Sequence, residues 1–308
     1  MITLDRLALA IPPHLIEWRH RERMYNSDNS DLPYHLQISF STKYNSYKVE
    51  FSAKVLGDRY PELINMNNIS ECLNTINTIG FCSFNVDEVI SFARVIGADF
   101  TKDIPLTDIP CVNNMNDVKS IIRLSINNYH RWNCENYRSG GIVISNAVND
   151  PRRRRRLTVY DKGYELGLSQ NRQFINSLHD ANALIEYFKD RVRFELRATT
   201  QRQLREWLGV RSLSIMSVLE STANPLRYVM TEMFSPIYAV DESEIRPTLT
   251  NCDKLCTLKL LDWDLARVEA HVRESTNRSV REGMKPYERL YRAHNVSESI
   301  NIVNVVGN

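Results

Sequence analysis

Residues 36–55 read LQISFSTKYNSYKVEFSAKV, and the alternation within this stretch decides the fold class. Polar and apolar residues roughly alternate in Leu36–Ser41 and again in Ser46–Val55, on either side of the connection Thr42–Asn45. A period of two is typical of a strand that buries one face, and a short connection joins two such strands into a hairpin. The stretch therefore predicts the first antiparallel pair of a β-sheet.

Further strands and helices follow along the chain. Strands are expected at Ala93–Ile104, Gly140–Ser145, Arg156–Asp161 and Arg191–Thr199. Helical spacing of apolar residues, with turn residues at the ends, predicts helices at Ile69–Ile79, Asn116–Trp132, Gln201–Leu208, Leu213–Glu220 and Leu226–Phe234. Strands and helices in this order predict the α+β class, with a central antiparallel sheet and helices packed on one face.

A boundary is expected after residue 236. Pro236 is followed by the acidic stretch Asp241–Glu244, and the helical patterns Leu255–Glu274 and Ser279–His294 come after it. We therefore predict one domain over residues 1–236, which would carry the function, and a helical C-terminal region over residues 237–308.

The composition indicates a globular chain. With 308 residues, 43% of them apolar, it can bury a sizeable core, and no apolar run reaches the roughly 18 residues that a membrane span needs. The N-terminus lacks a signal-peptide pattern, so the cytoplasm is the expected compartment. The six cysteines are scattered and are expected to be reduced thiols. The net charge of +2 is nearly neutral, but Lys and Arg concentrate in a few segments.

One of these basic segments carries a tyrosine and a lysine two positions apart. Residues 152–165 read RRRRRLTVYDKGYE, so Tyr160 and Lys162 would share one face if the strand continued through both. A phenol with a pKa of about 10 is a poor nucleophile at neutral pH unless a nearby cation favours the phenolate. Lys162 could supply that charge. An amphipathic strand with a rim tyrosine and a solvated lysine remains the alternative.

Acidic residues lie inside two of the predicted strands. Asp99, Thr101 and Asp103 would share one face of the strand 93–104, and Glu195 lies within the strand RVRFELR, residues 191–197. Carboxylates are disfavoured inside strands unless something binds them, so these positions are candidate functional sites. Asp99 could instead be a hydrogen-bonded edge carboxylate, and Glu195 could form an ion pair with Arg193 or Arg197.

Four ordered blocks between residues 36 and 210 carry a family resemblance. They are VEFSAKVL at Val49–Leu56, IGADFTKD at Ile96–Asp103, LTVYDKGYEL at Leu157–Leu166 and VRFE at Val192–Glu195. In this order they resemble the gene-two replication proteins of filamentous phages and related phage and plasmid replication proteins. The resemblance implies a degenerate rolling-circle initiator fold. It also implies that Tyr160 matches the tyrosine that nicks one DNA strand at the origin and stays joined to its 5′ phosphate.

The resemblance implies an enzyme, a site-specific DNA nickase and strand transferase that later rejoins ends. Tyr160 and Lys162 are then the expected catalytic residues. The expected cofactor is Mg²⁺ or Mn²⁺, which prefers oxygen ligands, with Asp99 and Glu195 as first-choice ligands and Glu165 and Asp103 as second choices. No two of the seven histidines lie two positions apart, so the chain has no His-hydrophobe-His motif, and acidic ligands are favoured.

Arginines are expected to contact the DNA backbone. The candidates are Arg152, Arg153, Arg154, Arg155, Arg156, Arg193 and Arg197. Such contacts position a strand without reading its bases. Aromatic residues near the preceding helix end, including Trp132 and Tyr137, could stack on unpaired bases. The five consecutive arginines could instead form a solvated hairpin tip.

The expected partner is therefore origin DNA, either single-stranded or supercoiled duplex, together with a helicase and a polymerase of a bacterial host cell. A relaxase or transposase using the same phosphotyrosine chemistry is one alternative. A non-catalytic origin-binding regulator, in which Tyr160 only packs, is the other. Tyr164 would lie on the same face as Tyr160 if the strand ran through Gly163, so it is a second candidate nucleophile.

Overall fold

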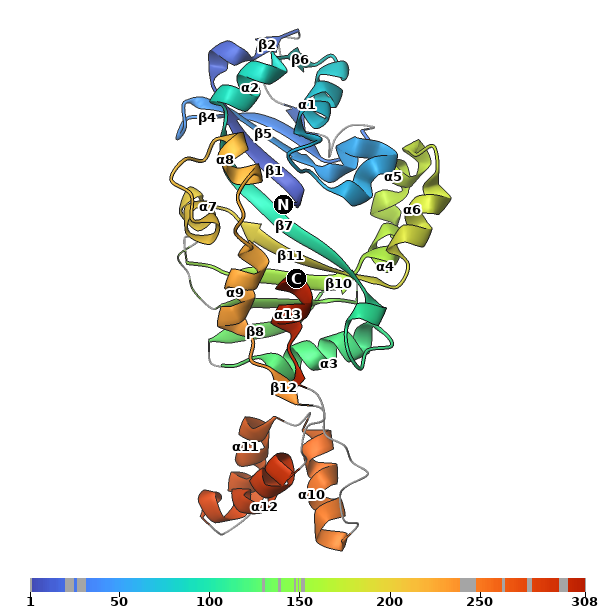
Figure 1. Ribbon diagram of the computed structural model, residues 1–308, viewed down its shortest axis with the longest axis vertical. Coiled ribbons are helices and arrows are strands. Elements are labelled where there is room, and N and C mark those ends of the chain that lie inside the picture. Colours follow the sequence, from blue (N-terminus) through green and yellow to red (C-terminus); the bar gives the residue numbers. More distant parts are fainter. Residues whose placement is uncertain are drawn as a thin grey trace.

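A large antiparallel sheet dominates the computed structural model (Figure 1). The structure describes residues 2–19, 25–26, 32–128, 131–137, 140–146, 148, 150, 153–238, 248–261, 264–275, 279–293 and 299–307. Within these residues nine strands form the sheet, in the order β3-β4-β5-β1-β7-β11-β10-β9-β8. They are β1 (Leu4–Ile11), β3 (Tyr25–Asn26), β4 (Leu36–Ser41), β5 (Ser46–Ser52), β7 (Arg94–Pro105), β8 (Trp132–Asn136), β9 (Ile142–Asn146), β10 (Arg156–Asp161) and β11 (Arg191–Ala198).

The helices and the two short strand pairs complete the element list. The pairs join β2 (Glu17–Trp18) to β6 (Cys82–Ser83) and β12 (Ile237–Tyr238) to β13 (Ser299–Ile300). The α-helices are α1 (Ile69–Thr78), α2 (Val86–Phe92), α3 (Met115–Ser125), α4 (Lys162–Leu166), α5 (Arg172–Ser177), α6 (Ala181–Phe188), α7 (Gln201–Leu208), α8 (Ile215–Leu219), α9 (Pro225–Met233), α10 (Leu249–Leu260), α11 (Leu265–Ser275), α12 (Val280–Ala293) and α13 (Ile302–Gly307). The predicted α+β class with an antiparallel sheet is confirmed.

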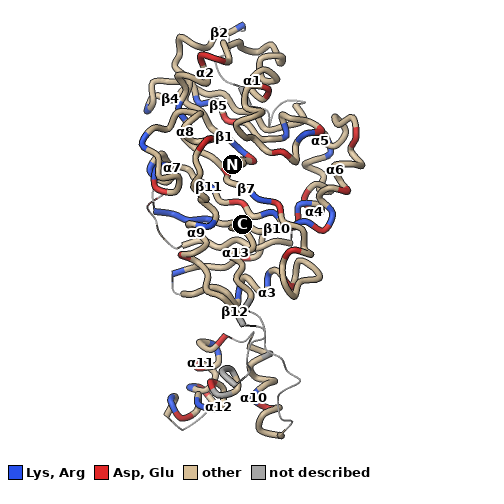
Figure 2. The backbone as a smooth tube through the Cα atoms, viewed as in Figure 1, with Lys and Arg blue, Asp and Glu red and all other residues tan. Residues whose placement is uncertain are grey.

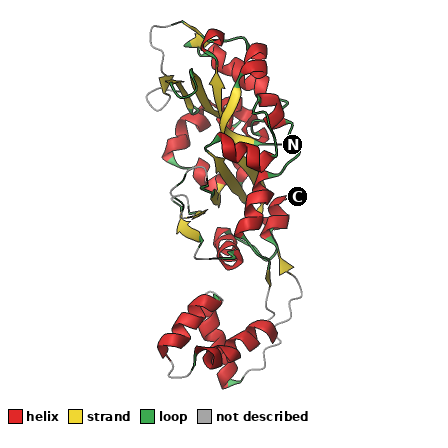
Figure 3. Ribbon diagram, turned by 90° about the vertical axis from the view of Figure 1, so that its left-hand side faces the viewer, coloured by secondary structure: helices red, strands yellow, loops and turns green. Residues whose placement is uncertain are grey.

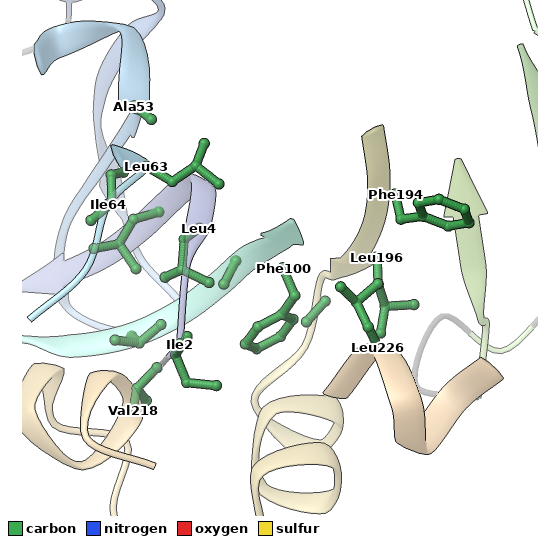
Figure 4. Close-up of a cluster of buried hydrophobic side chains, with 14 of the residues drawn as sticks. Ile2, Leu4, Ala53, Leu63, Ile64, Phe100, Phe194, Leu196, Val218 and Leu226 are labelled. Atoms are coloured by element: carbon green, nitrogen blue, oxygen red, sulfur yellow. The ribbon is translucent and has the colours of Figure 1, made fainter. Parts of the chain in front are cut away.

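Alternation along the strands divides the sheet into an apolar face and a polar face. On β11, for example, Val192, Phe194, Leu196 and Ala198 are buried on one side, and the residues between them are charged. The apolar face packs against helices: Leu196 of β11 lies beside Leu226 of α9, and Ile2, just before β1, lies beside Val218 of α8 (Figure 4). Burying such a side chain contributes about 1.5–3 kcal/mol each.

The central strand β1 has no counterpart among the predicted elements. It pairs with β5 on one side and with β7 on the other. Its register with β7 goes from Leu4 opposite Phe100 directly to Arg6 opposite Asp99, so Asp5 is an extra residue in a β-bulge. This bulge lets both Asp5 and Arg6 reach partners on the polar face, where they bind Arg193 and Asp99 respectively.

Strands β5 and β10 run in the same direction although three strands separate them. Each neighbouring pair from β5 through β1, β7 and β11 to β10 is antiparallel, and four reversals restore the original direction. Their C-terminal ends therefore lie toward the same edge of the sheet. Ser52 is the last residue of β5 and Lys54 follows it, while Tyr160 is the last residue but one of β10 and Lys162 follows the end of that strand.

Several predicted boundaries differ from the structure. The strand expected over Ser46–Val55 ends at Ser52, and an irregular 3₁₀ segment, Ala53–Glu62, follows it with a kink at Gly57. The helix expected over Asn116–Trp132 ends at Ser125, because Ile126 turns to an extended conformation and bridges to Phe234. Residues 162–188, for which no helix was predicted, contain α4, α5 and α6.

The helical region after residue 236 has its own small core. Helices α10, α11 and α12 pack together around Leu258, Val268, Val272, Met284, Tyr287 and Leu290 (Figures 1 and 3). Within the described residues, three helices lie where the two patterns Leu255–Glu274 and Ser279–His294 were expected, and a fourth, α13, follows them. The last residues return to the sheet: Ile300, Ile302, Val303 and Val306 belong to the main core, and α13 packs against α9.

None of the helices within the described part of the chain combines the length and the apolar character that crossing a bilayer requires.

Candidate active site

A polar cavity of about 610 Å³ opens on the polar face between the C-terminal ends of β5 and β10. We call it the tyrosine cavity. Strands β1 and β11 contribute part of its lining, and the 3₁₀ turn Ser169–Asn171 and the start of α5 contribute another part. Its charged and hydroxyl-bearing lining residues are Asp5, Arg6, Tyr34, Ser52, Lys54, Tyr137, Tyr160, Lys162, Glu165, Glu195 and Arg197.

Tyr160 points its hydroxyl at a carboxylate in this cavity. The hydroxyl donates a hydrogen bond to Oε2 of Glu195 at 3.1 Å, and the ring lies 5.8 Å from the ring of Tyr137. Tyr160 is only 5% exposed, although it lines the cavity. Burial raises the pKa of Tyr160 well above its usual value of 10, and the negative charge of Glu195 raises it further. The phenol is therefore protonated at neutral pH until a base takes its proton.

Glu195 is well placed to be that base. It lies mid-strand on β11, diagonally across from Tyr160 on β10, and it is opposite Thr101 on β7. Burial raises the pKa of Glu195 to about 7, and the charges of Asp99 and Asp5 add to the shift. Near neutral pH its carboxylate therefore exchanges a proton readily, as a general acid–base group must.

Lys162 does not have the predicted relation to Tyr160. Strand β10 ends at Asp161, whose side chain accepts a hydrogen bond from the Tyr164 amide and caps α4, so Lys162 is the first residue of a helix. Its ammonium lies 2.5 Å from Oε2 of Glu165 and 5.7 Å from the centre of the Tyr160 ring. Burial and Glu195 raise the pKa of Tyr160 overall, so Lys162 does not bring the phenol below its usual pKa.

The helix also removes Tyr164 from the face of Tyr160. Tyr164 lies on α4, its side chain is 58% exposed, and it does not line the tyrosine cavity. Tyr160 is therefore the better placed of the two candidate nucleophiles.

Three of the four predicted metal ligands are engaged by cations. Both oxygens of Asp99 accept hydrogen bonds from Arg197, at 3.0 and 2.8 Å. Both oxygens of Asp103 accept from Arg193, each at 2.7 Å. Glu165 binds Lys162 with one oxygen, and its other oxygen accepts hydrogen bonds from Asn171 and Gln170.

Glu195 fits a metal better than these three residues, because its carboxylate contacts the phenol of Tyr160 and lies 4.0 Å from Arg197 without a closer cation among the described residues. Asp5 lines the same cavity, and its bonds to Tyr60 and Arg193 both end at Oδ1. Within the described ranges, no group of three or more His, Cys, Asp or Glu side chains is arranged to hold a metal ion. Mg²⁺ is often held by one or two carboxylates and completed by substrate phosphates. Glu195 and Asp5 fit that kind of site, whereas Asp99 and Asp103 do not.

Arg193 was predicted to contact DNA, but it is a buried part of the protein. Its guanidinium is fully covered and binds Asp103 with two hydrogen bonds, Asp5 at 2.8 Å and the hydroxyl of Tyr60 at 2.6 Å. It joins β11, β7, β1 and the segment after β5 beneath the cavity. Its role is to hold the floor of the site together.

Replacing Arg193 with Met is expected to destabilise the fold by about 3–5 kcal/mol, because it leaves the buried carboxylates of Asp103 and Asp5 without their cation. Chemical denaturation with urea measures this loss. Arg59→Met is the matched control, since Arg59 forms its ion pairs with Glu62 and Glu71 in solvent and should change little. Equal stability of the two variants would show that Arg193 does not stabilise the site.

The arginine run, residues 152–156, contains both buried and exposed side chains. Arg155 is buried, binds Glu206 at 2.5 Å and lies over the ring of Trp207, so it is a structural residue. Arg153, Arg154 and Arg156 are exposed, as predicted for phosphate contacts. Arg152 lies outside the described residues.

Two further cavities continue the tyrosine cavity along the polar face. One, of about 430 Å³, contains Arg154 and Arg156 and shares Tyr137 with it. The other, of about 350 Å³, contains Lys48 and shares Arg6 and Arg197 with it. Charged positions of both signs lie on the adjacent strands β7, β10 and β11 (Figure 2). The three cavities thus follow one another across the sheet, with Tyr160 in the middle one.

The predicted aromatic platform is only partly present. Trp132 is 1% exposed and packs in the core, so it cannot stack on a base. Tyr137 lines two of the cavities and remains available. His35 also lines the tyrosine cavity, and its Nε2 lies 3.5 Å from Oε1 of Glu50.

Sequence reasoning missed Asp5, Lys54 and Tyr60 as parts of the site. Asp5 and Tyr60 depend on pairings across the sheet that no local pattern reveals. Lys54 lies inside the block VEFSAKVL, and like Lys162 it closely follows a strand: Lys54 is two residues after the end of β5, and Lys162 directly follows the end of β10. This similar placement of the two lysines could have marked Lys54 as a candidate site residue.

Gly141 controls how closely β9 approaches the backbone of Tyr160. A Cβ atom at Gly141 would lie 2.3 Å from the carbonyl oxygen of Val159 and 2.6 Å from Cβ of Tyr160. These distances are too short for any side chain, so the strands must separate if one is added.

Gly141→Ala is therefore expected to cost about 1–3 kcal/mol of stability and to displace Tyr160 from Glu195. Thermal unfolding measures the first effect. Gly167→Ala is the control, because its nearest neighbour, the Tyr164 carbonyl oxygen, is at an ordinary 3.4 Å. An unchanged melting temperature for Gly141→Ala would contradict the close packing described here.

Comparison with known proteins gives no further assignment: no family model, no curated protein and no solved structure matches this chain.

Proposed function

We propose that this chain nicks one strand of DNA through Tyr160 and keeps the cleaved 5′ end as a phosphotyrosine. The observation that carries the proposal is the hydrogen bond from the Tyr160 hydroxyl to Glu195 at the wall of a polar cavity. A tyrosine used only for packing needs neither a buried carboxylate partner nor a cavity rich in cations. The resemblance of the four sequence blocks to phage replication proteins supports the same reading.

The reaction is a transesterification. Glu195 accepts the phenolic proton while the Tyr160 oxygen forms a bond to phosphorus, and the bond from phosphorus to the 3′ oxygen breaks. The 3′ oxygen leaves with the electron pair of that bond and takes a proton from water. One phosphoester bond forms for each one that breaks, so the reaction is reversible and the reverse reaction rejoins the ends of the strand. Arg197 and Lys162 line the same cavity and can stabilise the negative charge that develops on the phosphate oxygens.

A divalent ion, Mg²⁺ or Mn²⁺, belongs to the proposal as a cofactor. Glu195 and Asp5 are the residues that would hold it together with phosphate oxygens of the DNA. When bound, such an ion would supply further stabilisation of negative charge on the phosphate. Asp99, Asp103 and Glu165 support the site by fixing the arginines and the lysine around it.

The two neighbouring cavities define a path for a DNA strand across the sheet. Arg154 and Arg156 lie on one side of Tyr160, and Arg6, Lys48 and Arg197 lie on the other. Phosphate contacts with such residues hold a strand in register without reading its sequence. We therefore propose an extended, locally single-stranded substrate that crosses the sheet from β9 and β10 toward β5.

In the cell this activity would initiate the replication of a phage or plasmid. The nick leaves a 3′ hydroxyl that a host polymerase can extend while a host helicase separates the strands, and the proposed location is therefore the bacterial cytoplasm. A relaxase or transposase would use the same chemistry on a different DNA. A regulator that only binds the origin would need the arginines but not the pair of Tyr160 and Glu195, so the pair favours an enzyme.

Incubation with a supercoiled plasmid that carries the DNA around the chain's own gene tests the proposal. With Mg²⁺ present, relaxed circles with protein attached to a 5′ end are expected. With EDTA, the amount should fall sharply. Supercoiled DNA that is bound but never relaxed, under either condition and also with Mn²⁺, would favour the regulator and contradict the nickase.

A further inference from the structure

Lys54 differs from the other cations that line the tyrosine cavity. Arg6 pairs with Glu50, Lys162 with Glu165 and Arg197 with Asp99. Across the described part of the chain, no carboxylate lies within the 4.0 Å of the Lys54 ammonium that would make an ion pair. Lys54 therefore brings into the cavity a positive charge that has no direct carboxylate partner, and the carboxylates of Glu165 and Asp5 act on it only at longer range.

The immediate partners of Lys54 are neutral. Its ammonium donates a hydrogen bond to Oδ1 of Asn171 at 2.5 Å and lies 5.2 Å from the centre of the Phe174 ring. Burial lowers the pKa of Lys54 to about 8, and the charge of Lys162 contributes to the shift. A partly buried cation with only neutral partners gains more from a bound anion than an exposed one does.

Ser52 adds an unused hydrogen-bonding group beside this cation. It is the last residue of β5 and lines the same cavity, and its hydroxyl is buried without a hydrogen-bond partner. A buried hydroxyl that makes no hydrogen bond costs free energy, which a ligand oxygen can restore. A hydroxyl and an ammonium two residues apart form a small set of donors suited to a phosphate oxygen.

We propose that Ser52 and Lys54 form a subsite for one phosphate group of the strand that Tyr160 attacks, a proposal that rests on the function proposed above. The two strand ends that carry Ser52 and Tyr160 face the same cavity, and its volume of about 610 Å³ admits more than one phosphate-bearing unit. The bound phosphate is a neighbour of the one that reacts, and Lys54 positions the strand without taking part in the proton transfer.

Binding of a single-stranded oligonucleotide to Tyr160→Phe protein tests the subsite without any cleavage. Adding Lys54→Met to this background is expected to weaken binding by about 10- to 100-fold. It should also reduce the slope of log affinity against log salt by about 0.7, the value for one phosphate on a single strand. Lys54→Arg should restore most of the binding. Lys189→Met is the control, because Lys189 is exposed, pairs with Glu186 at 3.3 Å and lines none of the three cavities.

A scan with methylphosphonates, each replacing one charged phosphate of the oligonucleotide by a neutral group, identifies the contact. We expect one position at which the neutral group weakens binding to the Lys54 protein about 10-fold or more and has no effect on the Lys54→Met protein. Ser52→Ala should show a smaller loss at that same position. If every position affects both proteins equally, the subsite does not exist.

The outcomes separate this inference from the proposed function. If the plasmid is never nicked but one phosphate depends on Lys54, the subsite stands and the nickase is wrong. If the plasmid is nicked and Lys54→Met binds the oligonucleotide as tightly as its parent, the nickase stands and the subsite is wrong.

Discussion

Tyr160→Phe is expected to lose nicking activity by at least about 10⁴-fold, the scale seen when an enzyme loses its nucleophile. The change removes one oxygen atom, the atom that would attack phosphorus, and leaves the ring that packs beside Tyr137. Neither the cavity nor the arginines around it depend on that atom. DNA binding should therefore stay within a few-fold of the original protein while the covalent adduct disappears. Relaxation of supercoiled plasmid and fluorescence anisotropy measure the two properties separately.

Tyr164→Phe is the matched control for this variant. Tyr164 is four residues away, exposed on α4 and outside the cavity, so its loss should leave both binding and nicking intact. If Tyr164→Phe abolished nicking and Tyr160→Phe did not, the nucleophile would be assigned to the wrong residue. Loss of DNA binding in Tyr160→Phe would mean that the hydroxyl has a structural role, and the activity result would then lose its meaning.

Glu195→Gln is expected to slow nicking by about 10²- to 10⁴-fold, the range for loss of a general base. The amide oxygen can still accept the hydrogen bond from Tyr160, but it cannot take the proton. The pKa of Glu195 in the metal-free protein is raised to about 7 by burial and by Asp99 and Asp5, and a bound divalent ion would lower it, so the original rate should climb tenfold per pH unit below a midpoint at or under pH 7 and level off above that midpoint. The variant should lack this dependence.

The free energy of unfolding of Glu195→Gln distinguishes a loss of catalysis from a folding defect. The folded pKa of Glu195 lies above its unfolded value of 4.5, so its ionisation opposes folding as the pH rises from about 4.5 through 7. Gln carries no charge to bury. The variant should therefore be at least as stable as the original protein at pH 8, as measured by urea denaturation. A variant that unfolds easily, or that keeps the slope below pH 7, would contradict the role given to Glu195.

Local sequence patterns predicted most of the sheet. The hairpin Leu36–Ser52 forms because alternation and a short connection lie within one stretch, and β7, β10 and β11 have the same period-two pattern. Helix α7 was bounded correctly because Thr200 and Gln203 cap its start and Gly209 takes a left-handed conformation after its end.

Long-range pairings account for what could not be predicted. Strand β1 becomes central only because β5 and β7, both distant in the chain, pair on its two sides, and the bulge at Asp5 breaks its short alternation. The same bulge brings Asp5 to Arg193, a pairing across 188 positions. Patterns within a window of residues cannot contain such contacts.

The sequence therefore predicted several of the residues that line the site, but it did not predict their ion pairs or their pKa shifts. Tyr160, Glu195, Lys162 and Arg197 were singled out and do meet in one cavity. Their roles changed because the strand ends at Asp161, a helix-capping residue that the sequence does display, and because Arg197 occupies both oxygens of Asp99. Whether a carboxylate is free to bind a metal depends on the partner opposite it, which only the register of β7 with β11 decides.

Mass spectrometry of the trapped protein–DNA adduct tests the central claim most directly. Trypsin cuts after Arg156 and Lys162, so Tyr160 lies in the peptide LTVYDK and Tyr164 lies in the next one, GYELGLSQNR. After nuclease digestion of the DNA, we predict a nucleotide joined to Tyr160 in the fragment covering Leu157–Lys162. A nucleotide on the peptide that follows, or on any other residue while LTVYDK is recovered unmodified, would contradict the account.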